Sequence, residues 1–204
     1  KFTEGTDAFE FSKEYSLLVE ETISEVCSIS EIDFTVAAFG SFSRRELSPF
    51  SDIDIMLITN SFNDDKAKIN KLITNLFDCG VEVSHTVREL TDPELFLKTD
   101  LHSFTQFFET NFIYGDSSLY NNWLNDITQL ITEPGAKILL KNFISDQNQR
   151  YHKYGASPKL LEPNVKLSAG GLRDLQSVEW MYLLFNKKFN NSKNNLSQTE
   201  NLIN

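Results

Sequence analysis

The sequence FGSFSRRELSPFSDIDI, residues 39–55, decides the fold of this 204-residue chain. A glycine-serine pair, Gly40-Ser41, follows a short apolar run, and an Asp-Ile-Asp sequence stands inside a second apolar run. Both runs are β-prone and predict strands, over residues 34–39 and 52–59. Because side chains alternate faces along a strand, the two aspartates share one face and the isoleucines beside them point to the other.

Asp52 and Asp54 are candidate metal ligands. Two ionised carboxylates this close repel each other, and a divalent cation between them removes that cost. Mg²⁺ is the expected ion, with Mn²⁺ as the alternative, and two ions can stabilise the attacking and leaving oxygens of an in-line displacement. Glu82, in a third strand predicted over residues 81–87, is the candidate third ligand because the valines beside it face the core. Alone, an Asp-x-Asp pair is more often a solvated strand face.

The glycine-serine pair is a candidate phosphate site. Gly40 lets the backbone approach a phosphate closely, and the hydroxyl of Ser41 can donate to it. A short helix predicted over residues 42–48 would add N–H groups at its N-terminus. Arg44 and Arg45 are candidates to neutralise triphosphate oxygens, and the alternative is a structural pair on the surface.

The rest of the chain is predicted from its hydrophobic periodicity. Apolar residues at helical spacing predict helices over residues 8–28 and 64–78. Beyond residue 88 the chain is expected to be helical to about residue 152, starting at a capping box formed by Thr91 and Glu94. A loop with two glycines follows over residues 160–173, and a last helix capped by Asp174 comes after it.

These elements predict an α+β protein. Residues 1–115 are expected to form a small mixed β-sheet with flanking helices, which is the catalytic head. Residues 116–204 are expected to form a helical domain that is truncated at its C-terminal end. The division follows from the pattern, since strands and helices alternate only in the first part.

Composition and charge limit the class of function. The chain is 40% hydrophobic and 12% aromatic, which is enough apolar material for a core. Its net charge of −10 makes nucleic acid a poor partner. No run approaches the roughly 18 apolar residues of a membrane span. Cys27 and Cys79 lack metal-ligand or secreted spacing, so we expect two buried thiols and a cytoplasmic protein.

Two motifs resemble a known family. Gly40-Ser41, then Arg44, Glu46, Leu47 and Pro49, then Ser51-Asp52-Ile53-Asp54 are similar to the signature of the nucleotidyltransferase superfamily that includes DNA polymerase beta. Within it, the chain most closely resembles the N-terminal part of bacterial protein-PII uridylyltransferases and related nucleotidyltransferases. That likeness rests on LEPNVK at residues 161–166 and GGLRDLQ at residues 170–176.

The resemblance implies an enzyme that moves an NMP from UTP or ATP to an acceptor hydroxyl and releases pyrophosphate. The acceptor it implies is a PII-like signalling protein. It assigns catalysis and metal binding to Asp52, Asp54 and Glu82. Nucleotide binding is expected from seven residues: Gly40, Ser41, Arg44, Arg45, Ser51, Lys166 and Arg173. For Arg173 the alternative is that it only anchors the last helix together with Asp174.

Two other functions remain open from the sequence. One is a transferase of the same fold that acts on RNA or on a small molecule, and the acidic charge disfavours RNA. The other is a regulatory module that binds nucleotide without turnover. The presence of both Asp52 and Asp54 disfavours a silent module, since such a module does not need the pair.

Overall fold

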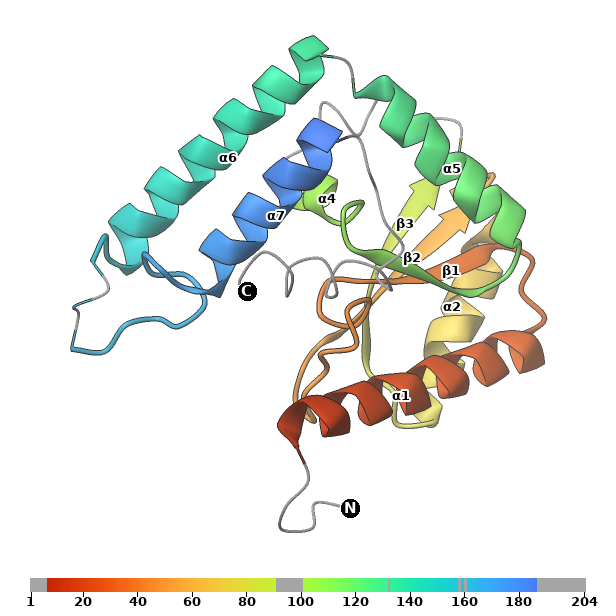
Figure 1. Cartoon of the computed structure of the whole chain (residues 1–204). Helices are drawn as coiled ribbons and strands as arrows, with labels where there is room; N and C mark the ends of the chain where they lie inside the picture. The colour runs from red at the N-terminus through yellow and green to blue at the C-terminus, as the bar shows by residue number, and fades with distance from the viewer. Residues whose placement is uncertain (1–6, 91–100, 132, 158, 160, 187–204) are drawn as a thin grey trace. The chain divides into compact units, whose positions relative to one another are not determined.

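The computed structural model of the chain, drawn in Figure 1, describes residues 7–90, 101–131, 133–157, 159 and 161–186. The chain forms two compact units, and each is considered by itself. Of the described residues, the first unit holds 7–90 and 109–124, and the second holds 101–108 and 125–186. The predicted domain boundary at residue 115 falls inside the first unit and stays a prediction.

A four-stranded sheet, in the order β3-β2-β1-β4, forms the centre of the first unit. Strand β1 runs antiparallel to both β2 and β4, whereas β2 and β3 are parallel. The predicted α+β class with a small mixed sheet is thus confirmed. The strands are β1 (Thr35–Phe39), β2 (Ile53–Thr59), β3 (Val83–Glu89) and β4 (Thr110–Tyr114).

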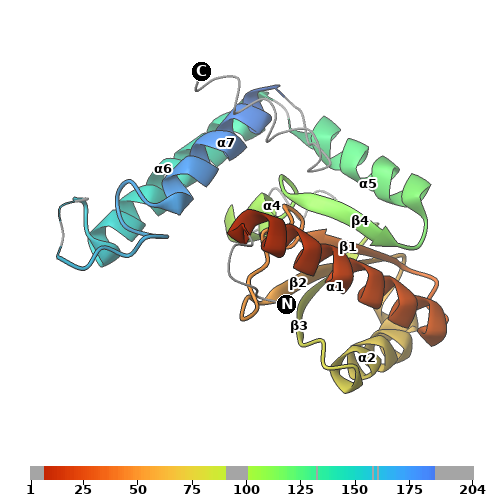
Figure 2. The same ribbon diagram turned by 60° about the horizontal axis from the view of Figure 1, so that its bottom comes forward.

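Helices α1 (Ala8–Ser30) and α2 (Phe62–Asp78) pack on one face of this sheet and confirm two of the predicted helices (Figure 2). Asp7 caps α1, because its side chain accepts the N–H of Phe9 at 3.0 Å. Ser61 caps α2 in the same way. The core between helices and sheet includes Val19, Ile23, Val26, Val36, Ala38, Ile53, Ile55, Leu57, Leu72 and Leu76.

Strand β4 corrects the prediction that residues 88–152 are all helical. It pairs with β1, and its Ile113 joins the core. The ring centroids of Phe112 and Tyr120 are 5.8 Å apart. Tyr120 belongs to helix α5 (Ser117–Leu130), so α5 contacts the sheet through β4. The strand is only five residues long, and its partner β1 lies far away in the sequence. The predicted helix start at Thr91 lies outside the described residues.

The second unit is helical. It contains α4 (Leu101–Thr105), the end of α5, α6 (Glu133–Tyr154) and α7 (Leu172–Asn186). Aromatic rings fill its core: the ring centroids of Phe104 and Phe108 are 5.2 Å apart, and those of Phe143 and Trp180 are 6.0 Å apart. The predicted last helix and the loop before it are present.

Both cysteines are free thiols. Cys27 is buried in the core, and burial raises the pKa of its thiol to about 12. Cys79 is exposed, so its predicted burial is wrong; it forms the C-cap of α2, where the helix ends in solvent. No helix in the described part of the chain has the length and apolar character to cross a membrane.

Candidate active site

Gly40 brings the end of β1 against the carboxylate of Asp54. A Cβ atom at Gly40 would lie 3.4 Å from Oδ2 of Asp54. The antiparallel pairing of β1 and β2 causes this approach. Ala38 lies opposite Ile55, so the end of β1 and the start of β2 lie at the same edge of the sheet. Gly40 has a φ of 63°, in the left-handed region that glycine adopts without strain. The structure thus brings together the glycine and the second aspartate of the sequence motif.

Asp52 and Glu82 each directly precede one of two neighbouring parallel strands. The first residues of these strands, Ile53 and Val83, lie opposite each other in the register. Asp52 and Glu82 are both exposed. The prediction placed Glu82 inside a strand, but β3 begins one residue after it. The roles of both carboxylates stay predictions.

The carboxylates do not form a closed metal cage. Within the described ranges, no group of three His, Cys, Asp or Glu side chains is arranged to hold a metal ion. Asp52 and Asp54 still suit Mg²⁺, because proteins usually bind this ion through one or two carboxylates, with substrate phosphates and waters as the other ligands. The donor set therefore fits an ion that arrives with a phosphate substrate.

Residues 40–46, here called the Gly-Ser turn, contain consecutive turns over residues 40–45 in place of the predicted short helix. Arg45 has a φ of 61°, which a right-handed helix does not accommodate. The N–H groups of Ser41 and Phe42 donate to no acceptor among the described residues. Successive free N–H groups in a tight turn can bind an anion. The phosphate-binding capacity of this segment therefore comes from a turn and not from a helix N-terminus.

Both arginines of the Gly-Ser turn are paired with carboxylates. Arg44 Nε lies 2.7 Å from Oε2 of Glu46, and its Nη1 pairs with Glu109. Arg45 Nη2 lies 3.2 Å from Oε2 of Glu20 on α1. Contact of either arginine with a triphosphate stays a prediction. Sequence reasoning missed Glu20 and Glu109, because no local spacing connects them with the turn.

Ser51 shapes the loop between the Gly-Ser turn and β2. Its Oγ accepts the N–H of Ser48 at 3.0 Å, and its own N–H donates to the Ser48 carbonyl at 3.0 Å. The two hydroxyl oxygens are 2.8 Å apart. These contacts hold the backbone just before Asp52. A nucleotide contact by Ser51 stays a prediction beside this local role.

Lys166 and Arg173 lie in the second unit, in the loop before α7 and at the start of this helix. The carbonyl of exposed Lys166 accepts the N–H of Arg173 at 2.9 Å. The Arg173 guanidinium lies over the ring of Trp180, 5.0 Å from its centroid. A Cβ at Gly171 would lie 2.8 Å from the carbonyl oxygen of Val165, so only glycine lets the loop fold this closely.

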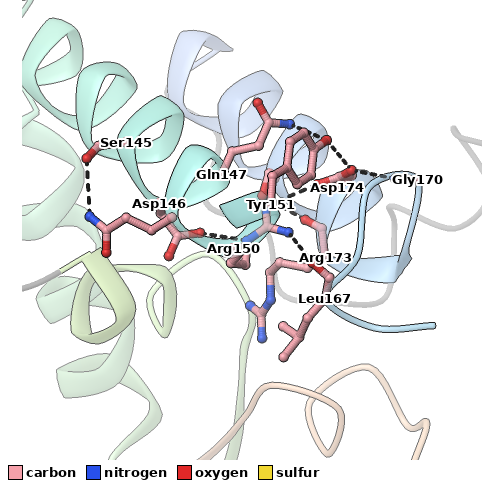
Figure 3. A network of polar contacts seen from close by, with 11 residues as sticks. Ser145, Asp146, Gln147, Arg150, Tyr151, Leu167, Gly170, Arg173 and Asp174 are labelled. Atoms are coloured by element: carbon pink, nitrogen blue, oxygen red, sulfur yellow. Dashed lines mark hydrogen bonds and ion pairs between the residues drawn. The ribbon is translucent and has the colours of Figure 1, made fainter. Parts of the chain in front are cut away.

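Asp174 ties this loop to α6 (Figure 3). Its carboxylate accepts hydrogen bonds from Nη2 of Arg150 at 3.1 Å, from the Tyr151 hydroxyl at 2.6 Å and from the Gly170 N–H at 2.8 Å. Arg150 is buried and pairs also with Asp146. The prediction that Asp174 is the helix cap is corrected, since α7 begins two residues earlier and Asp174 lies in its first turn.

Asp174→Asn is expected to destabilise the second unit by about 2 kcal/mol, because it removes one of the two carboxylates that pair with buried Arg150. Burial opposes ionisation of Asp174, but its hydrogen bonds with Tyr151, Gly170 and Arg150 outweigh burial and lower the pKa of the carboxyl. A carboxyl whose pKa is lower in the folded protein stabilises the fold at every pH above its pKa in the unfolded chain, which is about 3.9. This stabilisation is lost as the pH falls through the pKa of the folded state.

Thermal unfolding at neutral pH and at about pH 3 measures this effect. The wild type should lose more stability in acid than Asp174→Asn. Glu162→Gln is the matched control, because Glu162 is an exposed carboxylate of the same loop. Equal acid sensitivity of wild type and Asp174→Asn would contradict the expectation.

Two family models match the chain. Residues 19–113 match the nucleotidyltransferase domain, and these residues include the Gly-Ser turn and the Asp-Ile-Asp sequence. The chain carries a nucleotidyltransferase domain. Residues 139–203 match the GlnD PII-uridylyltransferase family, which confirms the narrower resemblance.

Relatives that match this chain are named bifunctional uridylyltransferase/uridylyl-removing enzymes. The relative from Nitrosococcus oceani is 30% identical over 188 residues, which are 89% of this chain and 21% of the relative. The relative from Bordetella avium is 34% identical over 149 residues, 72% of this chain and 17% of the relative. The chain thus spans about a fifth of the length of the curated relatives it matches.

Proposed function

We propose that this nucleotidyltransferase moves UMP from UTP to a hydroxyl group of a PII-like signalling protein. The observation that carries the proposal is the approach of Gly40 to the carboxylate of Asp54, which sets a phosphate-binding turn beside a candidate metal ligand. The names of the relatives and of the matching family support UTP as donor, with ATP as the other candidate.

Each group at the site has a role in this reaction. Asp52 and Asp54 would hold Mg²⁺, which when bound neutralises charge on the triphosphate. The N–H groups of Ser41 and Phe42 would bind phosphate oxygens and orient the α-phosphate for in-line attack. The acceptor oxygen forms a bond to the α-phosphorus, and the bond to the β-phosphate oxygen breaks, so that pyrophosphate leaves. Glu82 is the proposed acceptor for the hydroxyl proton.

Lys166 and Arg173, in the second unit, are also proposed to bind nucleotide. Lys166 is exposed on a loop whose backbone is held by internal hydrogen bonds. Such a loop can present a cation to phosphate without losing much conformational entropy. Arg173 is proposed to assist in the same way, as are Arg44, Arg45 and Ser51 of the first unit.

The test is incubation of the chain with Mg²⁺, each of the four NTPs labelled at the α-phosphate, and a purified PII protein. The expected result is a labelled PII band with UTP, which disappears when Mg²⁺ is removed by a chelator. Unlabelled RNA offered in parallel distinguishes the two acceptors, because the label then appears on RNA instead of on a protein. Binding of an NTP without any transfer would instead favour the regulatory module, and a chain that neither binds nor turns over an NTP would refute the proposal.

A further inference from the structure

Glu109 is a buried glutamate that directly precedes β4 and contacts the Gly-Ser turn. It is 7% exposed. Its backbone carbonyl accepts the N–H of Gly40 at 3.2 Å, and its carboxylate pairs with Nη1 of Arg44. One residue therefore holds both the first residue of the turn and the arginine in its middle.

Gly40 lies between two carboxylate residues: Asp54 of β2, and Glu109, the residue before β4. In the sheet, β1 lies between β2 and β4. On the β2 side, Gly40 meets the carboxylate of Asp54, and on the β4 side it is bonded to Glu109. Gly40 is thus the residue at which the contacts of Glu109 and the position of Asp54 come together.

The Arg44–Glu109 pair is the most enclosed of the three ion pairs of the turn. Its side chains are 17% and 9% exposed, whereas Glu46 is 38% exposed. The side chains of Arg45 and Glu20 are 22% and 25% exposed. Exposed pairs contribute little to stability, and an enclosed pair is the more costly one to break. Without Glu109, Arg44 keeps only the more exposed Glu46 among the carboxylates that pair with it here. Glu109 is therefore the partner whose loss should disturb the turn most.

We propose that Glu109 is a positioning residue of the nucleotide site. It acts through Gly40 and Arg44, and holds the Gly-Ser turn in the geometry that receives the triphosphate. This inference rests on the proposed function, because it requires that the turn binds a nucleotide. It needs no contact between Glu109 and the nucleotide itself.

The test compares Glu109→Gln with Glu20→Gln in the full chain. Both variants neutralise a carboxylate that faces an arginine of the turn, but only the first lies in the enclosed pair. Amide hydrogen exchange of residues 40–46 reports the turn directly, and titration with Mg–UTP, Mg–ATP and Mg–tripolyphosphate reports the site.

Glu109→Gln is expected to speed exchange in the turn about tenfold and to weaken Mg–UTP binding about tenfold, which is about 1.4 kcal/mol. Glu20→Gln should change neither by more than about twofold. Where turnover is measured, KM for UTP should rise while kcat changes less than about threefold, since the chemical groups are intact. Glu109→Asp keeps the charge and should lose less affinity than Glu109→Gln.

Unchanged exchange in Glu109→Gln overturns the inference, whatever the nucleotide affinity. Faster exchange with unchanged affinity also overturns it, because the turn would then not govern the site. Equal losses in Glu109→Asp and Glu109→Gln would show that charge is not what anchors Arg44. Failure of the wild type to bind any of the three probes refutes the proposed function as well, and the wild-type titration alone identifies this case. If Glu109→Gln does not fold, Glu109→Asp takes its place in both measurements.

Discussion

Asp54→Asn is expected to lower NMP transfer by about a thousandfold, which is the size of effect that follows removal of a key electrostatic group from an active site. The amide keeps the shape of the side chain but cannot neutralise a divalent cation. Because Asp54 is half-buried against Gly40, the variant should fold normally. The measurement is the initial rate of pyrophosphate release with UTP and PII protein, alongside far-UV circular dichroism.

Asp64→Asn is the matched control for this prediction. Asp64 is an exposed aspartate in the first turn of α2, in the same unit as Asp54. Its replacement should leave the rate within about twofold, because an exposed carboxylate away from the site contributes little to it. A rate that survives in Asp54→Asn would remove Asp54 from the proposed metal site, even if the wild type is an active transferase.

Gly115→Ala is expected to destabilise the first unit by about 3 kcal/mol or more, through backbone strain and overpacking. Gly115 directly follows β4 and has a φ of 104°, which side-chain-bearing residues rarely adopt. A Cβ there would lie 2.8 Å from the carbonyl oxygen of Phe34 and 2.8 Å from Cα of Thr35. Both atoms belong to the backbone at the start of β1, so they cannot move aside without disturbing the sheet.

Gly80→Ala separates strain from crowding. Gly80 has a φ of 78°, but no atom lies within 4 Å of a Cβ built there. Gly80→Ala should lower the free energy of unfolding only by the strain of a left-handed backbone, about 1–2 kcal/mol. Urea unfolding followed by circular dichroism compares the two variants, and hydrogen exchange of β1 locates the loss. A Gly115→Ala variant no less stable than Gly80→Ala would show that the backbone of β1 yields after all.

The strands that carry the site were predictable because their signals are local. Alternation over Ile53–Thr59 predicts β2 and the face of its aspartates, and the short apolar run before Gly40 predicts β1. Strand β4 was missed because its five residues show no clear period among many aromatic neighbours. Only its pairing with β1 makes Thr110–Tyr114 a strand.

The same difference separates the two halves of the candidate site. The aspartates, Gly40 and Ser41 stand out because their chemistry and spacing lie within one short stretch. The partners of the turn arginines do not, since Glu109 lies 65 residues from Arg44 and Glu20 lies 25 residues from Arg45. Likewise, the motif around Asp174 was visible, but its hydrogen bonds to α6 were not.

The sequence by itself determined the α+β class, the family and the identity of the candidate ligands, since each depends on residue type and short-range spacing. The tertiary structure decided which groups meet. It replaced a predicted helix by the Gly-Ser turn, placed the Asp54 carboxylate over Gly40 and brought Glu109 to Arg44. These contacts depend on strand pairing and on the exclusion of water between segments that are distant in the sequence. Neither produces a periodic pattern of residue types from which the contacts could be predicted.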